Sequence, residues 1–264
     1  KHDFPLMKVH KVYHKKDAIW PFTVVGRPPQ EDTSFGAMIH ELAGDTIQLE
    51  LPGVKAVHAV DAAGVHPLLF AIGSERYTPY VKERFPAEIL TQANHILGFG
   101  QMSLAKFLFI AAEEDNKDLN IDDEQVFLTH ILERVHWERD LHFYTNTSID
   151  TLDYSSEGLN SGSKVVVAAA GNKCRVLADH FETENPLPQG ISKVKLVAPG
   201  ILAVSCSAFE TYEKAHLEMK KWTEELKIVL GEKVNSLPLL VMTDDADFVA
   251  ETYNNFLWST FTRA

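Results

Sequence analysis

Apolar residues in the first half of the chain form short runs and helical stripes that alternate with turn signals. The stripe from 35 to 42 follows helical spacing, and we predict a helix that Asp32 or Thr33 caps and that Gly44 ends. The run LAKFLFIAA over 104–112 is almost wholly apolar, as expected of a strand that is covered on both faces. The other elements predicted here are strands over 55–60 and 65–73 and helices over 86–97 and 122–135.

A similar order of strand, acidic turn and helix recurs near the C-terminus. The run LPLLVMT over 237–243 enters DDAD, and a helical pattern then continues to Arg263. A shift of 129 positions superposes five identical residues on the earlier segment, which favours two related α/β units. The matched pairs are Asp115 with Asp244, Asp118 with Asp247, Phe127 with Phe256, Leu128 with Leu257 and Arg134 with Arg263.

The clearest amphipathic helix is predicted over 209–230, and Gly231 is expected to end it. Before it, a segment rich in Ser, Gly and Asn over 155–163 and two prolines between 181 and 190 indicate a boundary near 180–190. The pattern as a whole predicts the α/β class, with a mixed sheet and covering helices. The core-facing positions predicted for the long helix are Tyr212, Leu217, Met219, Trp222, Leu226 and Val229 or Leu230.

The start of the chain combines an expected strand with a stiff polar loop. Residues 4–25 mix β-branched, aromatic and basic residues, which predicts a strand that enters the loop GRPPQED over 26–32. Two prolines fix the backbone of this loop, so it suits either the rim of a binding site or a plain turn. The polar side chains that the loop presents are Arg27, Gln30, Glu31 and Asp32.

Composition and charge exclude several classes of function. The 264 residues carry 37 acidic and 25 basic side chains, and a net charge of −12 is the wrong sign for a nucleic-acid binder. Two isolated cysteines, Cys174 and Cys206, indicate a reducing compartment, so a cytoplasmic location is expected. No apolar run approaches the roughly 20 residues of a membrane helix. Because the chain begins at Lys1 and stops after a helical pattern, we interpret it as a fragment.

Two sets of residues contain side chains that could bind a metal ion, but both sets can also be explained by a structural role. His130, His136 and His142 lie near Glu133 and Asp140, but their spacing differs from the paired histidines of a helical zinc motif, and structural or surface histidines are favoured. The acidic clusters 113–118 and 244–247 follow predicted strands, where a cation could bind. The favoured alternative is that these carboxylates cap the next helix.

Several segments together resemble the UbiD-type decarboxylases. IWPFTVVGRPPQEDTSFG over 19–36 resembles the family's GRPP loop and the helix that follows it. KFLFIAAEED and FLTHILERV are similar to its strand with an acidic turn and to its next helix, which ends here at Arg134. NTSIDTLDYSS and GSKVVVAAAGNK, within 146–173, resemble two later loops of the family, although relatives can have an Asp where this chain has Val167-Ala168.

The resemblance implies a carboxy-lyase that acts on an aromatic or α,β-unsaturated acid similar to 3-octaprenyl-4-hydroxybenzoate, in quinone biosynthesis. Such an enzyme uses prenylated FMN with a divalent metal, Mn²⁺ or Mg²⁺, and K⁺. The family's catalytic acidic pair lies in an EGPFG(E/D) string, which this chain lacks. We therefore expect neither catalytic residues nor metal ligands here, no flavin bound to this chain alone, and a parent whose preceding flavin-binding domain packs on it.

The resemblance also carries over to three site positions. Phe35 and Gly36 match the apolar residue and the glycine at the wall of the substrate pocket, and Ser103 matches a hydroxyl residue near the cofactor. Arg27, Gln30 and Glu31 remain candidates in the loop. The expected division is 1–32 for the end of a β-barrel-like flavin region, 33–180 for the C-terminal α/β domain of the family and 190–264 for a second α/β unit.

Two other functions stay open at this point. The chain could be an assembly module that forms a homo-oligomer and packs on the flavin domain through exposed apolar surface. It could also be an independent α/β protein that binds a nucleotide or a metal ion at the turns of Asp115 and Asp244.

Overall fold

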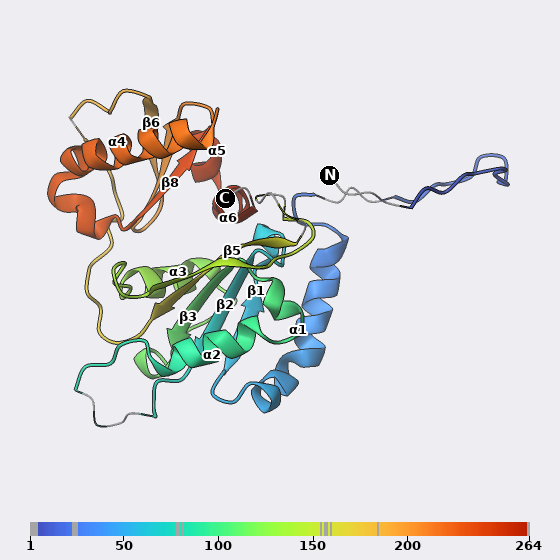
Figure 1. Cartoon of the computed structure of the whole chain (residues 1–264), viewed down its shortest axis with the longest axis horizontal. Helices are drawn as coiled ribbons and strands as arrows, with labels where there is room; N and C mark the ends of the chain where they lie inside the picture. Colours follow the sequence, from blue (N-terminus) through green and yellow to red (C-terminus); the bar gives the residue numbers. More distant parts are fainter. Residues whose placement is uncertain are drawn as a thin grey trace.

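A five-stranded sheet forms the centre of the computed structural model (Figure 1). Its strands are β1 (Ala56–Ala59), β2 (Leu68–Gly73), β3 (Phe107–Ala112), β4 (Leu141–Ser148) and β5 (Ser161–Ala169). They lie in the order β1-β2-β3-β5-β4, with three parallel strands in the middle and an antiparallel strand at each edge. The predicted mixed sheet is therefore confirmed. The structure describes residues 5–22, 26–77, 80, 82–153, 155, 158, 160–183 and 185–262, without the side chains of Glu31, Ala43 and Asp45.

Helices cover both faces of this sheet. The helices of this part of the chain are α1 (Glu31–Glu50), α2 (Glu88–Leu97) and α3 (Glu124–Leu132). Successive side chains of a strand point to opposite faces, so Phe70 packs with the residues of α3 while Leu69 packs on the side of α2. Because both faces of the sheet are covered, nearly every position of the central strands is hydrophobic in the sequence.

A second sheet of three strands follows. It contains β6 (Ile191–Ala198), β7 (Ile201–Cys206) and β8 (Leu239–Thr243), and β7 is antiparallel to β6 and parallel to β8. The crossover from β7 to β8 contains α4 (Tyr212–Leu230), whose Trp222 and Leu226 pack on one face of this sheet.

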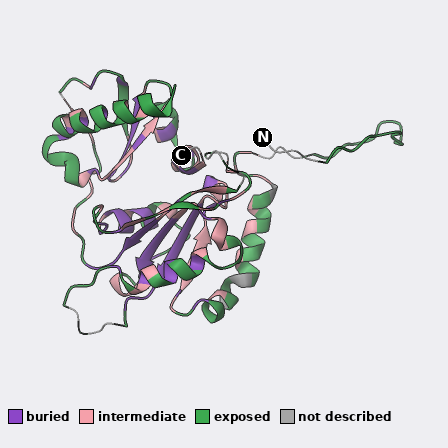
Figure 2. Ribbon diagram, viewed as in Figure 1, coloured by how far each residue is buried: buried purple, intermediate pink, exposed green. Residues whose placement is uncertain are grey.

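The last two helices join the two sheets into one core. These helices are α5 (Ala246–Glu251) and α6 (Tyr253–Thr262), and α6 lies between the sheets in Figure 1. Phe256 and Leu257 of α6 are fully buried together with Phe70 of the first sheet and Ala203 of the second. Figure 2 shows the buried residues concentrated on the strands.

Short helical segments connect several of these elements. They are η1 (Asp61–Ala63), η2 (Gly100–Leu104), η3 (Glu113–Asp115) and η4 (Gly231–Ser236). No helix in the described part of the chain is long and apolar enough to cross a membrane.

Two predicted boundaries at the start of the chain were wrong. The helix continues past Gly44 to Glu50, because Gly44 is tolerated inside a helix and Ile47 in the next turn packs against the core on the side of α2. Residues 5–22 contain no strand, since no other described segment supplies the hydrogen-bonding partner that a strand requires. The expected end of a barrel-like region is thus not shown.

The long helix buries less of its apolar surface than its sequence pattern predicts. Trp222, Leu226 and Leu230 are buried, as predicted. Tyr212, Leu217 and Met219 are exposed, because they precede the part of the helix that crosses the small sheet. Within the predicted repeat, Phe127 and Phe256 are both fully buried in one core, whereas Arg263 lies outside the described residues. The two related units stay a prediction.

Candidate functional site

The GRPPQED loop is fixed in place by contacts with its own helix and with the last two helices. The N-cap residue is Gln30, not Asp32 or Thr33, and the Gln30 backbone N–H donates to Thr33 Oγ1 at 3.0 Å. The Gln30 side-chain oxygen accepts from the Gly26 N–H at 2.9 Å. Arg27 donates to the side chain of Asn255 and lies 5.4 Å from the centre of the Phe248 ring. The side chain of Glu31, also a candidate, lies outside the described residues.

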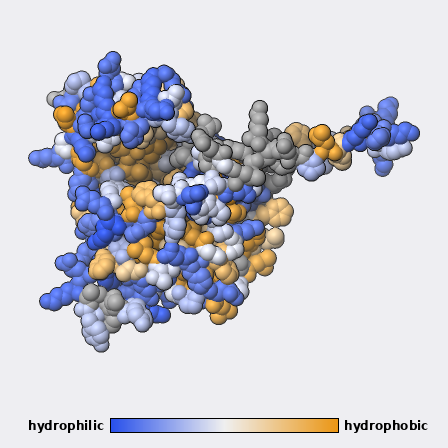
Figure 3. Space-filling model, in the orientation of Figure 1, coloured by the Kyte–Doolittle hydropathy of each residue, from blue (hydrophilic) through white to orange (hydrophobic). Residues whose placement is uncertain are grey.

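One face of α1 presents apolar side chains to solvent. Phe35 is 58% exposed, and a Cβ added to Gly36 would meet no atom within 4 Å. Figure 3 shows hydrophobic side chains along α1, at the right-hand edge of the molecule. Exposed apolar patches of this kind often mark interaction sites on protein surfaces. The exposed apolar residues of this face are Phe35, Met38, Ile39 and Leu42.

The opposite side of α1 is attached to the first sheet by polar contacts. Thr33 Oγ1 donates to the carboxylate of Asp61 in η1 at 2.9 Å. About two turns further on, the His40 ring lies 5.7 Å from the His58 ring of β1, and its Nε2 accepts from the Ala59 N–H at 3.4 Å. Burial lowers the pKa of His40, and the nearby His58 lowers it further, so the neutral ring that this contact requires is favoured.

An ion pair between His66 and Asp150 lies beside the first turn of α1. The hydrogen bond with Asp150 raises the pKa of His66, and Asp32 at the start of α1 adds to this effect. The same hydrogen bond lowers the pKa of Asp150. The pair connects the segment before β2 to the segment after β4. Sequence patterns did not reveal it, because its two residues lie 84 positions apart.

This ion pair predicts a pH-dependent contribution to stability. A raised histidine pKa stabilises the folded state below the unfolded pKa of about 6.5, and this stabilisation is lost as the pH rises through the folded pKa. We expect His66→Gln to destabilise the protein more at about pH 5.5 than at about pH 8.5, as measured by urea unfolding. His180→Gln serves as the control, since His180 is exposed and, among the residues that the structure describes, pairs with its neighbour Asp179 alone. An equal loss of stability at both pH values for His66→Gln would contradict this assignment.

Ser103 lies on a different element from the α1 face. It belongs to η2, its hydroxyl donates to the Gly100 carbonyl at 2.6 Å, and its own carbonyl accepts from the Lys164 ammonium. These contacts do not join Ser103 to Phe35 or Gly36 in the described part of the chain. Its position near a cofactor stays a prediction.

The acidic turns are engaged in caps and ion pairs. Asp115 accepts from Arg84 and from the Gly171 N–H, and Glu114 accepts from Ser74 and Glu75. In the second sheet, Asp245 caps α5 and Asp247 pairs with Lys193 and Lys195. Among the described residues, no three His, Cys, Asp or Glu side chains are grouped so that they could hold a metal ion.

Comparison with known proteins finds a family model and several relatives that match this chain. The family model of the 3-octaprenyl-4-hydroxybenzoate carboxy-lyase C-terminal domain matches residues 33–169. A subunit of the 4-hydroxybenzoate decarboxylase of Chlamydia pneumoniae is 35% identical over 99% of this chain and 40% of its own length. A protein of Chlamydia trachomatis is also 35% identical, over 100% of this chain and 41% of its own length. The chain thus spans about two fifths of the length of these curated relatives.

Two solved structures are similar at lower identity. The UbiD-class enzyme HmfF of Pelotomaculum thermopropionicum, in complex with FMN, is 16% identical and covers 57% of this chain and 30% of its own, with a TM-score of 0.41. The vanillic acid decarboxylase of Sedimentibacter hydroxybenzoicus in its open form is 15% identical and covers 68% of this chain and 31% of its own, with a TM-score of 0.39.

Proposed function

Because the chain belongs to the UbiD family of carboxy-lyases, through a C-terminal domain over residues 33–169, we propose that it forms the C-terminal part of a decarboxylase. The substrate class is an aromatic or α,β-unsaturated acid similar to 3-octaprenyl-4-hydroxybenzoate. The match to the family model is the observation that carries this proposal. Membership of a homo-oligomer and a cytoplasmic location stay predictions.

In this proposal α1 forms part of the wall of the substrate pocket. The apolar side chain of Phe35 and the bare backbone of Gly36 lie on the solvent side of the helix, where a preceding domain can pack. The polar contacts of Thr33 and His40 hold the helix on the first sheet and leave this face free. The task of the face is to exclude water and to orient the ring or double bond of the acid, which favours charge development away from bulk solvent.

The cofactor belongs to the preceding part of the protein in this proposal. The UbiD-class enzyme HmfF is described in complex with FMN, and an evolved dimeric form of the same enzyme is described in complex with prFMN. The α1 face is apolar, and the described residues provide no group that could hold a metal ion. The residues of the α1 face therefore do not fit a flavin phosphate with its cations, and no chemical step is assigned to them.

The proposal is tested by comparing two polypeptides. The longer polypeptide, with the preceding region restored, is expected to retain flavin on purification and to release carbon dioxide from acids of the stated class. The 264-residue chain alone is expected to do neither. Absence of flavin and turnover in the longer protein, or turnover by this chain alone, would overturn the proposal.

A substitution on α1 tests the pocket wall. In the longer protein, Phe35→Ala is expected to lower kcat/KM for the best acid about tenfold, because the pocket loses one apolar ring. Leu49→Ala is the matched control, since Leu49 is an exposed apolar residue near the other end of the same helix. Steady-state kinetics across a series of acids checks both variants. Equal kinetic effects of the two substitutions would place Phe35 outside the pocket.

A further inference from the structure

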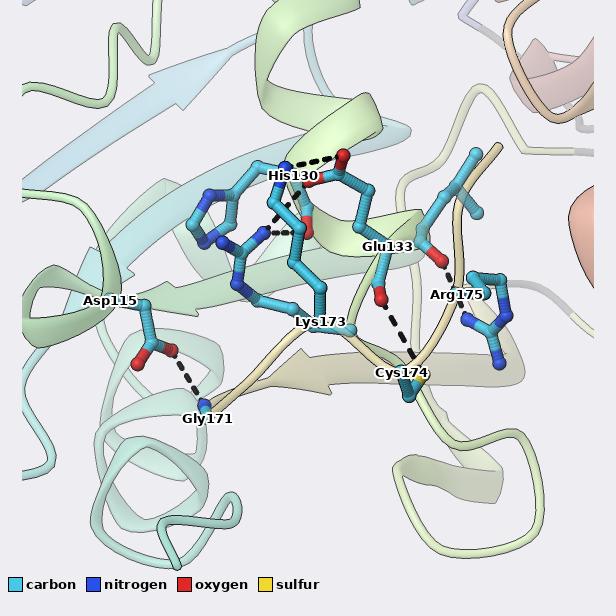
Figure 4. Close-up of polar contacts among 9 residues, drawn as sticks. Asp115, His130, Glu133, Gly171, Lys173, Cys174 and Arg175 are labelled. Carbon is cyan, nitrogen blue, oxygen red and sulfur yellow. Dashed lines mark hydrogen bonds and ion pairs between the residues drawn. The ribbon is translucent and has the colours of Figure 1, made fainter. Parts of the chain in front are cut away.

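A pocket of about 570 Å³ opens at the carboxyl ends of β3 and β5, away from the α1 face. In an α/β sheet this edge is where ligands commonly bind. Figure 4 shows His130 of α3 and Glu133, which directly follows this helix, close to Lys173 of the segment after β5, with Asp115 and Gly171 beside them. The residues of the pocket wall used below are Leu119, Val126, His130, Glu133, Arg134 and Lys173.

Arg134 is a buried cation whose hydrogen bonds are incomplete. It is only 7% exposed, and its Nη1 donates to the His130 carbonyl at 2.9 Å and to Glu133 Oε2 at 3.2 Å. Its buried Nε has no hydrogen-bond partner, and its Nη2 makes no hydrogen bond within the described part of the chain. The free groups form one edge of the guanidinium, and this edge binds the two oxygens of a carboxylate or phosphate. An unpaired buried donor of a charged group is costly, so a partner for it is expected.

Two more groups on the same wall complement an anion. His130 is 5% exposed, and its buried Nε2 also has no partner in the described structure. Burial, together with the positive charges of Arg134 and Lys173, lowers the pKa of His130 to about 4, so its ring is neutral near pH 7 and has one N–H that can donate a hydrogen bond. Lys173 uses one of its three N–H groups for a hydrogen bond to Glu133 Oε1 at 2.7 Å. Two N–H groups therefore remain for a ligand.

The carboxylates around the pocket already have partners. Glu133 is bound by Arg134 and Lys173 through its two oxygens. Asp115 accepts from Arg84 and from the Gly171 N–H, and Asp123 accepts from the Val126 N–H at the start of α3. None of these bonds uses the Nε–Nη2 edge of Arg134, which is therefore the group left for a ligand.

We propose that this pocket binds a small-molecule oxyanion, a carboxylate or a phosphate, on the Nε–Nη2 edge of Arg134, with Lys173 and His130 as further donors. Its volume exceeds what one such group fills, and Leu119 and Val126 on the wall offer apolar contacts to the remainder of the ligand. The site does not include the α1 face, so it is separate from the proposed decarboxylation.

The experiment titrates the 264-residue chain with inorganic phosphate, with acetate and, at matched ionic strength, with chloride. Calorimetry and the NMR signal of the His130 ring are the two measurements. A bound anion offsets the positive charges that act on His130, so the pKa of His130 is expected to rise in phosphate or acetate relative to chloride. Saturation by phosphate, by acetate or by both supports the site and identifies the class of ligand.

Variants separate a specific site from general charge attraction. Arg134→Lys keeps the charge but removes the bidentate edge, and we expect it to weaken binding about tenfold. Lys173→Gln is expected to weaken binding by about threefold to tenfold. Lys193→Gln is the matched control, because Lys193 is also an exposed lysine paired with one carboxylate, and binding should not change. If Arg134→Lys does not fold, Lys173→Gln and the His130 titration still decide the question. Absence of saturable binding by phosphate and acetate, or wild-type affinity in both pocket variants, would overturn the proposal.

Discussion

Phe256→Ala is expected to lower the free energy of unfolding by about 3–5 kcal/mol, the usual cost of removing a buried aromatic side chain. Phe256 is fully buried in α6, with its ring 5.2 Å from Tyr253 and 6.1 Å from Phe261. The core around it contains residues of both sheets, so the cavity removes contacts from the first sheet and from the second at once. Denaturant unfolding followed by circular dichroism measures the loss.

The control for this substitution is Phe22→Ala. Phe22 is exposed in a segment without helix or strand, so its removal should change stability by less than about 0.5 kcal/mol. A loss of less than about 1 kcal/mol for Phe256→Ala would show that α6 does not hold the two sheets together. That result would leave the second sheet as an independent folding unit.

The sheet could be predicted because its central strands carry a strong local signal. The run over 104–112 has no polar residue except Lys106, and β3 occupies its apolar part from Phe107 to Ala112. Ala-Ala-Gly between the first two strands likewise marks η1 and its left-handed Gly64. Gly44 misled the prediction, because the tertiary contact of Ile47 outweighs the modest cost of a glycine inside a helix.

The α1 face could be predicted in part. Helical spacing placed Phe35 on an apolar stripe, but spacing alone would bury that stripe, whereas the structure exposes it. The polar groups that hold the helix could not be found from spacing, since Asp61 and Ala59 lie 28 and 19 positions from their partners in α1. The pocket could not be predicted for the same reason, because Lys173 contacts Glu133 only after β5 has paired with β3. Contacts of this kind depend on strand order, which no local pattern specifies.

Gly171→Ala is expected to cost about 3–4 kcal/mol, from a strained backbone and from a clash that forces a neighbouring segment to move. Gly171 has a φ of +102°, which side chains rarely adopt, and an added Cβ would lie 2.3 Å from the carbonyl oxygen of Arg84. The segment cannot move freely, because Arg84 and the Gly171 N–H both bind Asp115.

Gly44→Ala separates this clash from the general effect of replacing a glycine. Gly44 lies inside α1 with no atom within 4 Å of an added Cβ, so alanine there should stabilise the protein by about 0.5–1 kcal/mol. Thermal unfolding of both variants gives the comparison, with the two shifts expected in opposite directions. Because Gly171 lies two residues before Lys173, a donor of the proposed anion site, Gly171→Ala should also weaken phosphate binding. Equal stability of Gly171→Ala and wild type would mean that the loop after β5 does not press against Arg84.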